Sequence, residues 1–161
     1  MKLIHDPNPI LKQKAEPWDF KNHVNAAVVE QEMLAIMKAN KGIGLAANQV
    51  GLLRRVFVLQ LKNGREVGCF NPYILIGDND LIHDQEGCLS FPNLWLNVKR
   101  HNKITAAYLD NAGKQCIIEL DGIDSRCFQH ELDHLDGITF TEYVSDLKLQ
   151  MARKKQRKLN G

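Results

Sequence analysis

The stretch from residue 24 to residue 40 carries apolar side chains at helical spacing, among them Val24, Val28, Met33 and Met37. Residues three or four positions apart on a helix share a face, so this stretch predicts an amphipathic helix. Two later stretches also predict helices, over residues 122–135 and 145–158.

Between these helices, apolar runs are separated by turn signals and predict strands. Asn63-Gly64 and Asn111-Ala112-Gly113 lie between neighbouring runs and are typical of hairpin turns. Strands clustered between helices indicate an α+β domain with a mainly antiparallel sheet. The expected strands cover residues 55–61, 67–76, 94–100, 103–109 and 115–120.

The chain of 161 residues is long enough for a single domain, 1–161, with a buried core. Hydrophobic residues make up 44% and charged residues 25%, which are proportions that exclude disordered, collagen-like and coiled-coil proteins. No apolar run approaches the roughly 20 residues of a membrane span, and the first residues resemble neither a secretory signal nor a transit peptide. We therefore expect a cytoplasmic protein with no membrane partner.

The four cysteines show no CxxC pairing, so reduced thiols are expected. Cys69 and Cys116 lie in apolar strand segments and are expected to be buried. Cys88 differs from both, because its segment is polar and contains a glycine.

The net charge of +2 is unevenly distributed. Six basic side chains and one acidic side chain lie between residues 145 and 161, so the predicted C-terminal helix is strongly basic while the remaining chain is mildly acidic. This distribution indicates that only the C-terminal helix meets an anionic partner. We expect a monomer that does not bind DNA.

The predicted helix at residues 122–135 contains the pattern H-E-x-x-H, formed by His130, Glu131 and His134. Two histidines four residues apart lie one turn apart on the same face and can bind one cation. Glu131 is rotated by about 100° from His130, so it lies beside the metal, where it can take a proton from water.

A two-histidine site needs a third ligand, and the identity of that ligand decides the class of enzyme. In metzincins the pattern continues to a third histidine, but Phe140 takes that position here and cannot bind a metal. Cys127 is seven residues, or about 10.5 Å of helix axis, from His134, too far for easy convergence with His130. Cys88 is therefore the preferred third ligand, and a metallopeptidase with a different third ligand is the alternative.

Three segments occur in the order and with the spacing of the peptide deformylase family, which this sequence closely resembles: Gly42-Ile43-Gly44-Leu45-Ala46-Ala47-Asn48-Gln49, Glu86-Gly87-Cys88-Leu89-Ser90 and Gln129-His130-Glu131-Leu132-Asp133-His134. The N-terminal His5-Asp6-Pro7 also looks like that family's N-terminus, so the resemblance covers nearly the whole chain. It implies an α+β metallohydrolase with its sheet around a central metal-binding helix. The implied reaction removes the formyl group from N-formyl-methionyl peptides.

The resemblance also implies a role for each site residue. Glu131 would be the catalytic carboxylate, which accepts a proton from water and returns it to the departing amine. Gln49 and the backbone N–H of Leu89 would form an oxyanion hole, in which one donor is typically worth about 3–4 kcal/mol. One Fe²⁺ per chain, replaceable by Zn²⁺, Ni²⁺ or Co²⁺, would be bound by Cys88, His130 and His134.

An apolar pocket for the methionine side chain is implied as well. Arg126 departs from the family pattern, in which this residue is often aliphatic, and Trp95 lies in a region where relatives often carry arginine near the rim of the cleft. Because a charge is costly to bury, we expect the Arg126 guanidinium to point outward with its stem along the pocket wall. The implied lining comprises Ile43, Gly44, Glu86, Gly87, Ile123, Arg126 and Cys127.

The basic helix at residues 145–161 has two interpretations: an element that docks on the ribosome, as the resemblance implies, or a solubilising tail. A non-catalytic protein that only binds the ribosome or another partner is a further alternative. The presence of every side chain with an implied role argues against it. If the chain is encoded by a phage rather than by a bacterium or an organelle, its compartment would be the host cytoplasm.

Overall fold

The computed structural model describes residues 1–22 and 25–161. Its elements are the 3-10 helix η1 (Pro9–Lys12), α1 (Ala26–Ala39), β1 (Gly44–Ala46), η2 (Ala47–Val50), β2 (Val56–Gln60), β3 (Glu66–Gly77), β4 (Leu81–Cys88), β5 (Phe91–His101), β6 (Lys103–Leu109), β7 (Gln115–Asp121), α2 (Gly122–Leu135), η3 (Phe140–Tyr143) and α3 (Asp146–Asn160). The predicted α+β class is confirmed, and the five predicted strands are present with slightly different ends.

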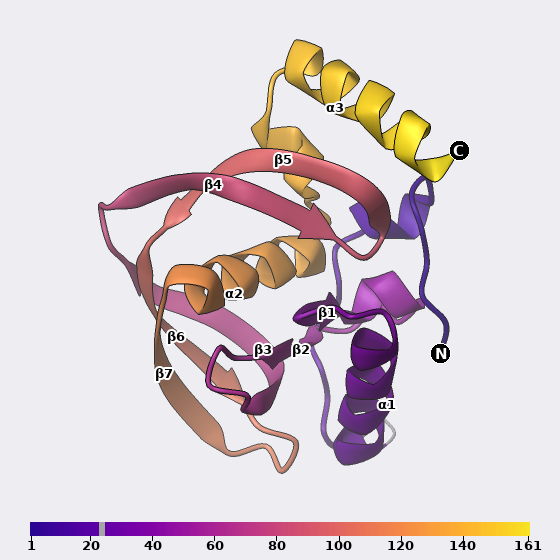
Figure 1. Ribbon diagram of the computed structural model, residues 1–161. Helices are drawn as coiled ribbons and strands as arrows, with labels where there is room; N and C mark the ends of the chain where they lie inside the picture. Colours follow the sequence, from indigo (N-terminus) through magenta and orange to yellow (C-terminus); the bar gives the residue numbers. More distant parts are fainter. Residues whose placement is uncertain (23–24) are drawn as a thin grey trace.

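The strands form two sheets, one of five strands in the order β1-β2-β3-β6-β7 and one of two strands, β4 and β5. All pairs of these strands are antiparallel, as predicted. Helix α2 lies between the β4–β5 ribbon and the larger sheet, whereas α3 covers the outer side of β5 (Figure 1). None of the described helices is long and apolar enough to cross a membrane.

Helix α1 begins later than predicted, because Asn25 caps it by accepting a hydrogen bond from the backbone N–H of Ala27 at 2.9 Å. Val24 lies outside the described residues. Val28, one of the apolar residues that predict this helix, does not face the core, since it is 58% exposed. The face turned to the core consists of Ala26, Val29, Met33, Leu34 and Met37.

Two strands, β1 and β4, were not expected from the sequence. Strand β4 is largely polar and exposed, and it exists because it pairs with β5 from Leu81 opposite His101 to Cys88 opposite Phe91. Strand β1 has only three residues, too few for a periodic pattern to be seen. Each of these two strands lies beside α2 or carries residues of the site. The two strands that the sequence did not predict therefore help to build the site.

Helix α2 is fixed to the larger sheet by aromatic packing. The ring of Phe128 meets that of Phe57 on β2 edge-to-face, with centroids 4.9 Å apart. A separate apolar cluster beneath α3 contains Phe91 and Phe140, whose ring centroids are 5.4 Å apart. On the other side of α2, the His130 ring meets the Phe140 ring of this cluster edge-to-face, with centroids 5.6 Å apart, so the helix is packed on both sides.

All four cysteines are free thiols. Cys69 is buried as predicted, and burial raises the pKa of its thiol well above the ordinary value. The prediction for Cys116 is wrong, because β7 is an edge strand and leaves this residue partly exposed.

Candidate metal centre

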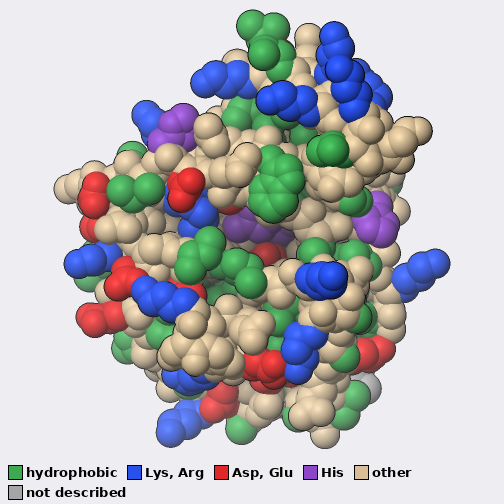
Figure 2. Space-filling model, in the orientation of Figure 1, with side chains coloured by type: hydrophobic (Ala, Val, Ile, Leu, Met, Phe, Trp, Pro, Cys, Tyr) green, Lys and Arg blue, Asp and Glu red, His purple; other side chains and the backbone are tan. Residues whose placement is uncertain are grey.

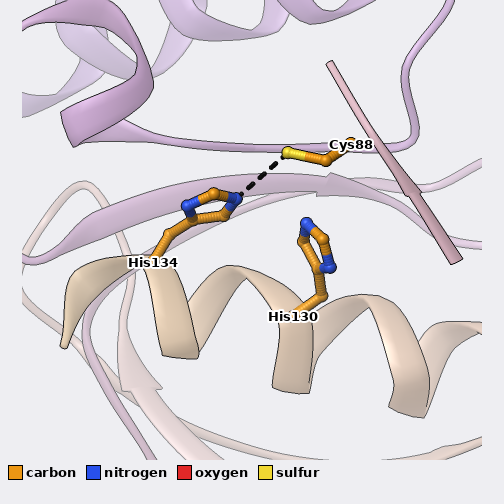
Figure 3. Close-up of side chains that lie close together, drawn as sticks. All are labelled: Cys88, His130 and His134. Carbon is orange, nitrogen blue, oxygen red and sulfur yellow. Dashed lines mark hydrogen bonds between the residues drawn. The ribbon is translucent and has the colours of Figure 1, made fainter. Parts of the chain in front are cut away.

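The end of β4 meets the C-terminal half of α2 at a cluster of three possible metal ligands. His130 and His134 project from successive turns of α2, and Cys88 is the last residue of β4 (Figure 3). One ligand atom from each residue lies within 4.8 Å of the other two. Cys88 Sγ lies 3.3 Å from His134 Nε2.

The donor atoms fit a divalent transition metal. A thiolate and two imidazoles are soft or borderline ligands, which suit iron or zinc better than magnesium. His130 Nδ1 lies 2.7 Å from Glu86 Oε1, and a carboxylate on one ring nitrogen of a ligating histidine leaves the other nitrogen free for a metal. Burial lowers the pKa of His134 well below its ordinary value, so this imidazole is neutral, as ligation requires.

The site also favours positive charge. Burial opposes protonation of His130, but hydrogen bonds to Cys88 and Glu86 outweigh it and raise the pKa of His130 well above its ordinary value. A cation held by the three residues would place positive charge where these acceptors already stabilise it.

Glu131 lies beside the cluster and is 4% exposed. Burial raises the pKa of its carboxyl group from 4.5 to about 7, with a smaller contribution from Glu86, while His130 and Arg100 oppose the shift. Among the described residues, none forms a hydrogen bond with Glu131 Oε2. A carboxyl group with these properties can both accept and donate a proton near neutral pH.

The backbone of β1 passes very close to Glu131. A Cβ atom at Gly44 would lie 2.6 Å from Glu131 Oε1 and 2.6 Å from Cys127 Sγ, so only glycine fits there without displacing them. The small residues of this segment therefore allow one wall of the site to approach α2.

Gln49 lies behind Cys88 rather than on the open surface of the site, and it is 1% exposed. Its Nε2 donates to Ser90 Oγ at 3.0 Å and lies 3.5 Å from Cys88 Sγ, while its Oε1 accepts from the backbone N–H of Ala46 at 2.8 Å. These contacts fix the orientation of the amide. Leu89 follows Cys88 in the turn between β4 and β5 and lines the open side of the site.

A cleft of about 510 Å³ opens over the cluster. Figure 2 shows it as a recess near the middle of this face, with histidine side chains at its floor. Three apolar side chains lie at its edge, namely Ile43 (45% exposed), Ile123 (48%) and Trp95 (55%). All seven residues predicted to line a substrate pocket line this cleft: Ile43, Gly44, Glu86, Gly87, Ile123, Arg126 and Cys127.

The prediction that the Arg126 guanidinium points outward is wrong. The residue is 5% exposed, and its guanidinium donates to Glu86 Oε2 at 2.8 Å and to the carbonyl oxygens of Val98 and Ile82 at 2.7 and 2.6 Å. These acceptors compensate for the cost of burying the charge. The sequence did not reveal them, because β4 was not expected.

Sequence reasoning also missed a buried ion cluster behind His130. Arg100 donates to both oxygens of Glu86, at 2.8 and 3.0 Å, and to Asp133 Oδ2 at 2.6 Å. Burial of Glu86 alone would raise its pKa, but hydrogen bonds with His130 and Arg100 lower it to about 2. Arg100 is the penultimate residue of β5, a strand with alternating apolar residues, and a charged residue at an inward position was the available signal.

Comparison with known proteins gives consistent similarities along nearly the whole chain. The family model described as "Polypeptide deformylase" matches residues 1–150. A relative named "Peptide deformylase 2" from Xanthomonas campestris pv. campestris is 37% identical over 163 residues, which cover 99% of this chain and 95% of the relative.

Solved structures are similar as well. A peptide deformylase from Legionella pneumophila has a TM-score of 0.90 and 32% identity, with 99% of this chain and 94% of that chain covered. A peptide deformylase from Synechococcus elongatus in complex with actinonin also has a TM-score of 0.90 and 32% identity, with 98% and 88% covered.

Proposed function

The chain belongs to the polypeptide deformylase family and is a hydrolase that removes the formyl group from formylated N-termini; from this premise we propose which of its residues carry the reaction. The observation that carries the proposal is the meeting of Cys88, His130 and His134 beside a buried carboxyl group with a raised pKa, that of Glu131. The whole chain, residues 1–161, would act as one deformylase domain.

We propose that Cys88, His130 and His134 hold one divalent ion, with Fe²⁺ as the native metal and Zn²⁺, Ni²⁺ or Co²⁺ as substitutes. When bound, the ion acts as a Lewis acid that makes water a stronger nucleophile near neutral pH. Helix α2 would thus be the metal-binding helix of the fold. Glu86 would keep His130 in the tautomer that ligation requires, since it occupies Nδ1.

Glu131 would transfer the proton in both halves of the reaction. It takes a proton from water as the water oxygen attacks the formyl carbon, and it gives this proton to the amine nitrogen as the C–N bond breaks. The products are formate and a free N-terminus. The raised pKa of Glu131 suits both directions of transfer, because the acid and the base form are then close in free energy.

Gln49 and the backbone N–H of Leu89 would stabilise the negative charge that develops on the formyl oxygen during attack. Ala46 and Ser90 fix the orientation of the Gln49 amide, and its second Nε2 hydrogen, which lies toward Cys88 Sγ, would be the one donated to the formyl oxygen. The methionine side chain of the substrate would occupy the cleft against Ile43 and Ile123, which offer exposed apolar surface.

Formate release from formyl-Met-Ala-Ser tests the proposed reaction directly. The protein is reconstituted with Fe²⁺ under anaerobic conditions, because a thiolate ligand makes the site sensitive to oxidation. Formate is expected from the formylated peptide, and no acetate is expected from the acetylated peptide. A chain that binds the ion but releases no formate would contradict the proposal.

Replacing Gln49 with Leu is expected to lower kcat for formate release by about 10²–10³-fold, because one oxyanion donor is lost. Steady-state kinetics with formyl-Met-Ala-Ser measure the effect. The matched control is Ser90→Ala, which removes a partner of the amide but keeps the donor itself. If Gln49→Leu kept the kcat of the parent chain, the amide would have no part in stabilising the charge.

We further propose that α3 docks on the ribosome, where formylated chains emerge, and that the protein works in the cytoplasm. Lys and Arg side chains gather over α3 at the top of Figure 2, and Leu147, Met151 and Leu159 of the same helix are 60–67% exposed. The helix itself is held to the body, because Arg153 bonds to Asp6 and Gln156 to the carbonyl of Pro92.

Reversing three exposed charges of α3 tests this docking without removing the helix. The triple variant Lys154→Glu, Lys155→Glu, Lys158→Glu is expected to sediment less with ribosomes, because its attraction to phosphate groups is lost. Turnover of the free peptide should stay unchanged, since these side chains lie outside the cleft. Equal sedimentation of the variant and the parent chain at low salt would exclude docking through these charges.

A further inference from the structure

The ligands of the proposed metal centre come from two separately paired parts of the fold. Cys88 belongs to the β4–β5 ribbon, whereas His130 and His134 belong to α2. The ribbon is a sheet of its own and shares no strand with the five-stranded sheet (Figure 1). The separation of the Cys88 thiol from the two imidazoles therefore depends on how the ribbon is held against α2.

Arg126 connects these two parts at their centre. Its Nη2 donates to the carbonyl oxygen of Ile82 on β4 at 2.6 Å, and its Nη1 donates to the carbonyl oxygen of Val98 on β5 at 2.7 Å. The same Nη1 lies 2.8 Å from Glu86 Oε2, two residues before Cys88. One guanidinium group on α2 thus binds the backbone of both strands and a side chain of β4.

The position of Arg126 on α2 relates it directly to the ligands. It precedes His130 by four residues, so both side chains lie on the same face of the helix, toward the ribbon. Glu86 binds both of them, Arg126 through Oε2 and His130 through Oε1. A displacement of the ribbon away from Arg126 would therefore move Cys88 relative to His130.

The chemistry of these contacts requires arginine. A guanidinium group is planar and presents donors in several fixed directions, whereas an ammonium group is a compact charge that cannot span two strands. The charge of Arg126 is not needed to neutralise Glu86, because Arg100 also forms a close ion pair with that carboxylate. Arg126 thus contributes mainly through the fixed directions of its hydrogen-bond donors.

We propose that Arg126 is a positioning residue that holds the β4–β5 ribbon against α2 and sets the distance between Cys88 and the two histidines before a metal ion binds. This inference rests on the proposed function, since it assumes that these three residues are the ligands. Ligands held in place lose less freedom on binding than ligands that must first be ordered. Loss of an outer partner of this kind costs about 10–100-fold in metal affinity.

The test compares three variants of the full chain after the metal has been removed with a chelator. Arg126→Met keeps an apolar stem along the cleft but removes the donors, and Arg126→Lys keeps the charge. Arg55→Met is the matched control, because Arg55 also bonds to a carbonyl oxygen and a carboxylate, those of Leu135 and Asp136, away from the ribbon. Co²⁺ is then titrated while the thiolate-to-cobalt absorption band is recorded.

A second measurement on the metal-free proteins reports how firmly the β4–β5 ribbon is held. Amide hydrogen exchange over residues 81–101 is compared with exchange over α1, which packs mainly against β1 and β2 rather than against the ribbon. A role in general stability alone would change exchange in both regions, whereas a positioning role changes it in the ribbon.

Arg126→Met is expected to bind Co²⁺ about 10–100-fold more weakly than the parent chain. Its ribbon should exchange faster while α1 is unchanged. Arg126→Lys should also bind Co²⁺ more weakly, and Arg55→Met should bind it like the parent chain. Parent-like Co²⁺ affinity in Arg126→Met would overturn the positioning role of Arg126, and so would an equal loss of Co²⁺ affinity in Arg126→Met and Arg55→Met. Neither result would contradict the proposed metal centre. Absence of the thiolate band in the parent chain would overturn the proposed metal centre together with the positioning role.

Discussion

Replacing Glu131 with Gln is expected to lower kcat for formate release by about 10²–10⁴-fold, the range that general acid–base catalysis typically contributes. The amide has nearly the same shape as the carboxylate but cannot accept the proton of the attacking water. Metal content should be unchanged, because Glu131 is not one of the three residues whose ligand atoms converge.

The surroundings of Glu131 allow this substitution to change proton transfer without disturbing the fold. The residue is 4% exposed, and no described residue forms a hydrogen bond with its Oε2, so the neutral amide should be accommodated without loss of a contact. Burying an amide also costs less than burying a carboxylate, and the melting temperature should not fall. Glu119→Gln, an exposed change on β7, is the matched control for the loss of one negative charge. Retained turnover in Glu131→Gln would refute the role of the carboxyl group in proton transfer.

Replacing Cys88 with Ala is expected to remove most of the metal from protein purified under aerobic, metal-limited conditions. Two imidazoles alone form an incomplete site. The loss in metal affinity should therefore be larger than the decrease of about 10–100-fold that follows loss of a residue that only hydrogen-bonds to a ligand. Formate release should fall with the metal content. The measurement is the number of metal ions per chain after gel filtration, together with kcat.

Cys127→Ala provides a control within the same cleft. The Cys127 thiol is buried and lies 3.6 Å from the carbonyl oxygen of Ile43, outside the group of converging ligand atoms. This variant should retain its metal, which would separate loss of a ligand from loss of any thiol. Full metal content in Cys88→Ala would show that the third ligand is a different residue.

The helices and most strands could be predicted because they follow from local patterns. Helix α2 was expected at residues 122–135 and occupies Gly122–Leu135, since its polar face and its apolar residues repeat with the period of a helix. The hairpins at Asn63-Gly64 and Asn111-Ala112-Gly113 connect β2 to β3 and β6 to β7, as expected from their turn residues.

Strand β4 could not be predicted in this way. Its residues from Leu81 to Glu86 are mostly exposed and largely polar, and their extended conformation is stabilised by β5 and by Arg126 rather than by their own pattern. The same contacts explain the error at Arg126. A side chain expected to reach solvent is buried, because the unpredicted strand supplies the acceptors that its guanidinium group needs.

The sequence by itself determined the chemistry available to this protein: two imidazoles one helical turn apart, a carboxyl group beside them and a thiol in a polar segment. These features depend on residue type and on spacing within one element, which local rules describe. Only the tertiary structure decided that Cys88 reaches the histidines, that Glu131 is buried with a pKa near 7, and that Arg126 binds both strands of the ribbon. Distances and burial of this kind arise between elements far apart in the chain, through packing that no local pattern encodes.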